Sequence, residues 1–114
     1  MGMMKKLMKS RRHYSRDRQY DFEEIVLAND KYGDFCFRGR RIGGQVVTSE
    51  SGVLDLSVFQ THKDEIVLEL QYRASDHCIR RVSKFSTGQE AFEHMTRLIT
   101  LFKGGNMQML WEYL

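Results

Sequence analysis

The chain contains no proline, and only two of its 114 residues are cysteines. Without proline, no cis X–Pro bond can slow folding, and the turns must rely on Gly, Asn, Asp and Ser. Cys36 and Cys78 lie far apart, outside any CxxC motif and each within a predicted strand. We therefore expect two reduced, half-buried thiols rather than a disulfide framework.

Long apolar runs are also absent. No stretch of about 18 apolar residues exists, so no helix is predicted to span a membrane. The first residues lack the apolar segment of about 7–15 residues that a secretory signal requires. We expect a cytoplasmic protein without a membrane partner, and its small size favours a bacterial, phage or mobile-element origin.

Positive charge is concentrated at the start of the chain. Residues 1–18 carry seven of the eighteen basic side chains and one acid, Asp17, for a net charge of about +6. Residues 19–114 carry eleven basic and fourteen acidic side chains. This asymmetry predicts a flexible basic arm over residues 1–18 and a single folded domain over residues 19–114.

Most of the domain has the residue pattern of strands. Six segments are predicted as strands: 22–28, 34–40, 45–49, 53–59, 65–73 and 77–85. The clearest alternation places Leu54, Leu56 and Val58 on one face and Asp55 and Ser57 on the other. Strict alternation is typical of antiparallel strands with one buried and one wet face.

One amphipathic helix follows the strands. Ser86 or Thr87 can be its N-cap, because Ser86 with Gln89 and Thr87 with Glu90 each form a capping-box pattern, and Gly104-Gly105 can end it. Strands followed by a helix predict an α+β fold. We expect an antiparallel β-meander of about five to six strands, with one C-terminal amphipathic helix packed on one face. The apolar tail, residues 106–114, could add a strand, add a short helix or dock on a partner.

Clustered cations indicate a surface for a polyanion. Phosphates attract basic arms, and Tyr14 could stack on an exposed base. Two arginine clusters continue this theme in the domain. The alternative interpretations are a solvated terminus for the arm and exposed strand faces for the clusters. The predicted nucleic-acid-binding residues are Lys5, Lys6, Lys9, Arg11, Arg12, Arg16, Arg18, Arg38, Arg40, Arg41, Arg80 and Arg81.

Two strand patterns bear on these clusters. The glycine-rich segment 39–44 matches neither a Walker motif nor GxGxxG, so it does not support a nucleotide cofactor. In a strand, Arg80 and Lys84 share one face and Arg81 takes the other. Three aromatic residues of the domain have two interpretations, base stacking and burial in the core. These residues are Phe35, Phe37 and Tyr72.

The tail is the best candidate for a protein interface. Trp and Tyr are frequent in binding hot spots, and Met adapts to irregular surfaces. The predicted partner-binding residues are Met107, Met109, Trp111 and Tyr113. The alternative is that the tail completes the core of its own chain. A two-fold dimer that exchanges tails or edge strands is a related possibility.

No catalytic signature is found. The four histidines, His13, His62, His77 and His94, have no metal-ligand spacing, and no nucleophile stands beside a base in a known motif. We therefore expect no metal, no cofactor and no enzymatic activity. The preferred hypothesis is a small nucleic-acid-associated binding protein that neutralises phosphates. The alternative is a protein-interaction module, an inhibitor or adaptor, that uses the tail and a sheet edge.

Overall fold

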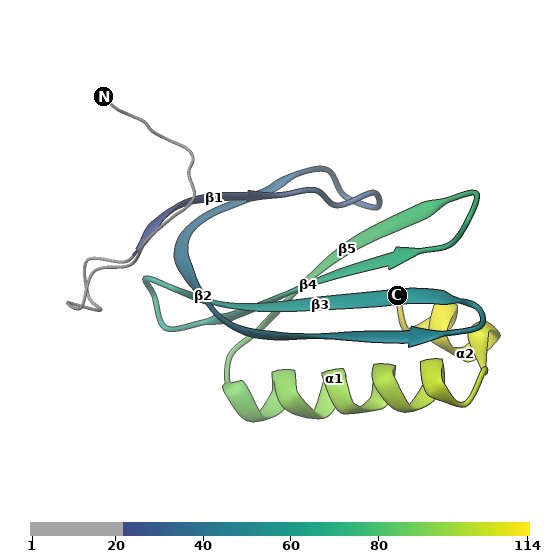
Figure 1. The fold of residues 1–114 in the computed structure, drawn as a ribbon. Helices are drawn as coiled ribbons and strands as arrows, with labels where there is room; N and C mark the ends of the chain where they lie inside the picture. The colour runs from purple at the N-terminus through teal and green to yellow at the C-terminus, as the bar shows by residue number, and fades with distance from the viewer. Residues whose placement is uncertain (1–21) are drawn as a thin grey trace.

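A computed structural model describes residues 22–114 of the chain. The predicted flexible arm, residues 1–18, lies outside the described residues. One antiparallel sheet with the strand order β1-β2-β3-β4-β5 is followed by two helices (Figure 1). This confirms an α+β meander. The elements are β1 (Glu23–Leu27), β2 (Phe35–Ser49), β3 (Gly52–Thr61), β4 (Ile66–Arg73), β5 (Cys78–Phe85), α1 (Gly88–Lys103) and α2 (Met107–Tyr113).

Strand β2 replaces two of the predicted strands, because the irregular stretch between residues 40 and 45 does not end it. Arg41 pairs with Phe59 of β3, and Gly43 pairs with its neighbour Val58, so that Ile42 is the extra residue of a bulge. A bulge absorbs one residue and bends the strand while the ladder continues. The first part of β2, Phe35 to Gly39, pairs with β1, and the part from Gly39 to Ser49 pairs with β3. Only Gly39 pairs with both strands.

The main core lies between the sheet and the two helices. Helix α1 crosses one face of the sheet, and α2 packs at its C-terminal end (Figure 1). The alternation seen in the sequence directs Leu54 and Leu56 of β3 into this core, where both are fully buried. The buried members of the main core are Val47, Leu54, Leu56, Leu68, Leu70, Tyr72, Leu98, Phe102 and Leu110.

A second, smaller core occupies part of the opposite face. It consists of Leu27, Phe59 and Val67, and half-buried side chains from β1, β2 and β5 surround it. These residues come together because β1 and the first part of β2 curl over the sheet (Figure 1). The backbone N–H of Asp30, after β1, donates to the carbonyl of Arg80 in β5 at 3.0 Å. The sheet is thus curled, and its first hairpin contacts its last strand.

The capping box at the start of α1 is confirmed. The Thr87 side-chain oxygen accepts a hydrogen bond from the Glu90 backbone N–H at 3.2 Å, and the Glu90 carboxylate accepts one from the Thr87 N–H at 3.3 Å. These two bonds satisfy N–H groups that the first turn of a helix leaves without partners. Lys103 ends the helix, where a cation suits the negative end of the helix dipole.

The tail forms a second short helix, α2, which is one of the three alternatives that the sequence left open for residues 106–114. Gly105 has a positive φ of 75°, a conformation that glycine adopts easily, and the chain turns back there. The Asn106 side chain then caps α2 by accepting from the Met109 N–H at 3.3 Å. Leu110 is fully buried against the main core. No helix among residues 22–114 is long and apolar enough to cross a bilayer.

The prediction of half-buried cysteines is wrong. Cys36 and Cys78 are both free, and both are exposed. On β2 the neighbouring Phe35 and Phe37 point toward the second core, so Cys36 faces outward. Cys78 opens β5 opposite Arg73 and points away from the main core, because the next residue, Ile79, packs against that core.

Candidate nucleic-acid interface

Phe22 lies four residues after the predicted arm, within the predicted domain. Its ring lies beneath the guanidinium of Arg40, 5.2 Å from ring centroid to Cζ. A cation over an aromatic face is attracted by the ring's quadrupole. Phe22 therefore contacts one of the arginines that the sequence predicts to bind nucleic acid.

Besides its contact with Phe22, the Arg40 guanidinium forms hydrogen bonds with Gln60. Its Nε and Nη2 atoms donate to the Gln60 side-chain oxygen at 3.1 and 2.9 Å. The Gln60 amide nitrogen in turn donates to the Asp64 carboxylate at 2.7 Å. This amide relay connects Arg40 of β2 to the β3–β4 turn and orients its guanidinium.

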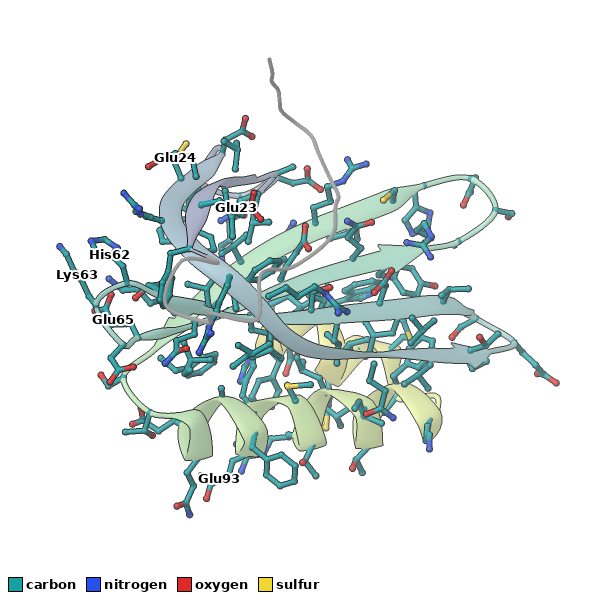
Figure 2. The ribbon with its side chains drawn as sticks, turned by 60° about the vertical axis from the view of Figure 1, so that its left-hand side comes forward. Glu23, Glu24, His62, Lys63, Glu65 and Glu93 are labelled. Atoms are coloured by element: carbon teal, nitrogen blue, oxygen red, sulfur yellow. The ribbon has the colours of Figure 1, made fainter. Side chains whose placement is uncertain are left out.

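The β3–β4 turn adds the side chains of His62 and Lys63 to the same end of the sheet. The His62 N–H donates to the Arg38 carbonyl at 2.9 Å, which fastens the turn to β2. Arg38, His62 and Lys63 are all exposed, and His62 and Lys63 project outward from the sheet end (Figure 2). We call Arg38, Arg40, His62 and Lys63 the root cluster.

Acidic groups border the root cluster. Glu24 is the cross-strand neighbour of Arg38, and Figure 2 shows it on the adjoining strand β1. Glu65, which follows the turn, forms an ion pair with Lys84 at 3.6 Å. The sheet end is therefore not uniformly positive.

Arg41 lies on the other face of the sheet from the root cluster, because adjacent strand residues point in opposite directions. Its Nε approaches the Ser57 hydroxyl at 3.4 Å. The guanidinium lies over Gly44, where a Cβ would collide with Arg41 and with the Leu56 carbonyl oxygen. The glycine after the bulge thus makes room for this arginine.

The face that carries Arg41 holds a mixed set of charges. Glu69 lies in the field of Arg41 and Arg80, and its carboxylate accepts from the Gln71 amide at 3.4 Å. Partial burial is the largest influence on Glu69 and raises its pKa, an effect that the Gln71 hydrogen bond and the two arginines oppose and the charge of Asp55 adds to. We call the part of this face that carries Arg41, Asp55, Glu69 and Arg80 the open face.

Acids and bases offset each other on the open face. Asp55 forms an ion pair with Arg73 at 3.5 Å. Arg80 is half-buried and stands opposite Gln71 on β4. The open face therefore offers no continuous basic stripe among the described residues.

Arg81 has a structural environment. It points to the opposite side of β5 from Arg80 and Lys84, as the strand pattern predicts. Its Nη1 donates to the Arg80 carbonyl at 3.1 Å and lies 3.8 Å from the Asp30 carboxylate, which also accepts from the Arg80 N–H. Arg81 thus helps to hold the first hairpin against β5.

The predicted arginines are therefore divided among three places. Arg38 and Arg40 belong to the root cluster, Arg41 and Arg80 to the open face, and Arg81 to the contact with Asp30. The seven cations of the predicted arm lie outside the described residues. The aromatic candidates for stacking are occupied within the fold: Phe35 and Phe37 pack in the second core, and Tyr72 is buried in the main core.

The predicted partner-binding residues lie on α2 and make internal contacts. Trp111 packs edge-on against Tyr72, with ring centroids 5.1 Å apart, and Met107 packs against the main core. The Tyr113 ring contacts the His94 ring at 5.6 Å. The tail completes the core of its own chain, while Met109 remains 47% exposed and Trp111 36% exposed.

No group of three His, Cys, Asp or Glu side chains among residues 22–114 could hold a metal ion. His94 lies between the Phe85 and Tyr113 rings, and burial, together with the nearby charge of Arg97, lowers its pKa. His77 contacts the neighbouring Asp76 at 2.7 Å, and this contact lowers the pKa of Asp76.

The chain matches no protein-family model, no curated protein and no solved structure. Its function must therefore be argued from its own side chains.

Sequence reasoning missed part of the root cluster. His62 and Lys63 indicate only a turn in the sequence, because nothing local shows that this turn folds back onto Arg38. Glu69 was also missed, since its alternation with Leu68 and Leu70 suggests an ordinary solvated acid. An acid in the middle of a strand, with arginines predicted on neighbouring strands, is the signal that could have pointed to it.

Proposed function

We propose that this protein binds nucleic acid through its basic arm and the root cluster. The observation that carries the proposal is the contact between Phe22 and Arg40. Phe22 follows the strongly basic segment of residues 1–18 by four residues in the sequence, and Arg40 belongs to the same cluster as the exposed Arg38 and Lys63. A phosphate backbone bound by the basic segment is therefore expected to reach the root cluster as well.

The expected mechanism is neutralisation of phosphates with little reading of bases. Lysines and arginines that contact phosphates release condensed counter-ions, and this release drives binding. Arg40 is oriented by Gln60, so it is prepared for a directed contact, whereas the long side chains of Arg38 and Lys63 are exposed. The positions of Phe35, Phe37 and Tyr72 within the two cores remove the obvious platform for base stacking on the domain.

The proposed surface is narrower than the predicted set. Arg41 and Arg80 have acidic neighbours on the open face, and Arg81 faces Asp30, so these three arginines are not included. The acidic excess of the domain should repel phosphates away from the root cluster. Such a role also requires a compartment that holds nucleic acid, which agrees with the expected cytoplasmic location.

The test is fluorescence anisotropy with labelled DNA and RNA, single- and double-stranded and of equal length, at about 50 and 200 mM salt. Four phosphate contacts on duplex DNA predict roughly a hundredfold loss of affinity over this range. Replacing the seven arm cations by Gln in the full chain is expected to abolish binding. The double variant Arg38→Gln/Lys63→Gln is expected to lower the salt slope by about 1 for each phosphate contact that it removes.

Lys103→Gln is the matched control, because it removes one exposed positive charge at the far end of α1. It is expected to bind as the parent chain does. The proposal fails if the parent chain does not bind at the lower salt concentration, or if its affinity is the same at both. Equal losses in the Lys103 and Lys63 single variants would contradict the root cluster in particular.

A further inference from the structure

Helix α1 turns one face away from the sheet, and this face carries an unusual aromatic residue. Phe92 is 68% exposed although it belongs to the amphipathic helix of the fold. A shallow hollow lies beside it on the same face. The hollow is lined by Phe92, Glu93, Thr96, Arg97, Thr100 and Leu101.

The threonines of this face behave as small apolar residues. The Thr96 hydroxyl donates to the Phe92 carbonyl at 2.9 Å, and the Thr100 hydroxyl donates to the Thr96 carbonyl at 2.8 Å. Because both hydroxyls already have acceptors within the helix, covering them would leave no donor unsatisfied. What remains toward the outside is largely methyl groups beside the Phe92 ring.

Opposite charges border this strip one helical turn apart. Glu93 projects away from the sheet (Figure 2) and accepts from the Gln89 amide at 3.3 Å. Arg97 lies over the Tyr113 ring, 5.5 Å from its centroid. The face therefore combines a projecting ring, a hollow, one acid and one base within little more than two turns.

We propose that this face of α1 binds the same face of a second copy of the chain, with the two helices antiparallel about a two-fold axis. A two-fold interface uses one patch twice, so the patch must be complementary to itself. In the antiparallel arrangement, Glu93 of each copy lies beside Arg97 of the other. Each Phe92 ring fits against the partner's hollow, and the small threonines let the helices approach closely.

The charge pattern is what selects a second copy as the occupant. A partner of uniform charge would meet either Glu93 or Arg97 unfavourably, whereas an identical antiparallel helix satisfies both. A single pair of helices lies at the low end of interface size, so the dimer is expected to depend on protein concentration. It differs from an exchange of tails or edge strands, because α2 and the sheet edges take no part.

The first test is sedimentation of the full chain over a wide concentration range, without nucleic acid. The parent chain is expected to shift from monomer to dimer as concentration rises, and Phe92→Glu is expected to remain monomeric. Tyr32→Glu is the matched control, since Tyr32 is an aromatic residue of similar exposure in the turn between β1 and β2. Thermal unfolding of each variant checks that it is folded.

The second test uses charge reversal. Glu93→Arg alone and Arg97→Glu alone each place like charges together and are expected to be monomeric. Mixing these two variants restores both attractive pairs and is expected to give a heterodimer, and the double reversal in one chain restores the homodimer. Because every measurement is made without nucleic acid, the result is independent of the proposed function.

Several outcomes would overturn the proposal. A parent chain that is monomeric at all concentrations would show that this face does not bind a second copy. A dimer that survives Phe92→Glu would lie on another surface. A mixture of the two charge variants that stays monomeric would exclude the antiparallel pairing of Glu93 with Arg97.

Discussion

The two faces of the sheet are built from the same alternating strands but differ in how much of each face is buried. On the helix-covered face, nine buried residues from the sheet and both helices form one continuous core. On the other face only Leu27, Phe59 and Val67 form a buried cluster among the described residues, and the rest of that face carries Arg41, Glu69 and other charged groups. The comparison teaches that one face supplies stability, whereas the other is closed only where the first hairpin curls over it.

Removing one large side chain from each core tests this difference most strongly. Phe102 is fully buried, and Phe102→Ala is expected to cost about 3–5 kcal/mol of unfolding free energy, because α1 holds the cavity open. Phe59→Ala should cost at least about 1 kcal/mol less, since the small second core can relax around it. Urea unfolding of both variants provides the measurement, and an equal or larger loss for Phe59 would contradict the comparison.

The helix-covered face is the part of the fold that the sequence predicts well. Leu54 and Leu56 alternate with polar residues, and Thr87 and Glu90 are only three residues apart, so the information is local. The open face could not be predicted in the same way. Whether Arg41 lies beside Glu69 depends on the bulge at Ile42 and on strand register, neither of which a short segment determines.

The root cluster shows the same limit. Arg38 and Arg40 were selected for their charge, but their neighbours His62 and Gln60 come from a hairpin about twenty residues later. Arg81 is predicted for the same reason, yet Asp30, 51 residues earlier, gives it a structural role. Sequence reasoning found the charges, and only the curl of the sheet divides them into separate places.

The bulge offers a second test, confined to the open face. Gly44→Ala would place its Cβ 2.5 Å from the Leu56 carbonyl oxygen and against the Arg41 guanidinium, and a loss of about 1–3 kcal/mol is expected. Gly43→Ala is the matched control, because a Cβ at this position would have no atom within 4 Å. Thermal and urea unfolding should separate these neighbouring variants, and equal stability would show that the open face tolerates rearrangement at Arg41.

The two faces are also expected to respond to pH with opposite signs. His94, against the helix-covered face, has a folded-state pKa below its ordinary value of 6.5. Between those two pKa values the unfolded chain binds more protons, so stability falls as the pH is lowered through 6.5. The loss is at most about 1 kcal/mol because the ring is partly solvated.

His94→Gln should remove this part of the pH dependence, measured as urea unfolding free energy between about pH 7 and 5. His77→Gln is the control, since His77 is exposed and contacts the Asp76 carboxylate and, in a tilted arrangement, the Tyr72 ring. If the two variants keep the same acid sensitivity as the parent chain, the neutral ring of His94 is not its source.

Glu69 gives the smallest and most specific test of the open face. Its folded-state pKa lies above the ordinary 4.5, so between those values the folded chain binds more protons than the unfolded chain. Stability therefore falls as the pH rises from 4.5 through the folded-state pKa, which is opposite to the effect of His94. Glu69→Gln should stabilise the protein near pH 7 by about a few tenths of a kcal/mol, because solvent and the two arginines offset much of the burial cost. A loss of stability in this variant would mean that the attraction of Arg41 and Arg80 outweighs the burial cost of Glu69. The charged groups of the open face would then stabilise the sheet.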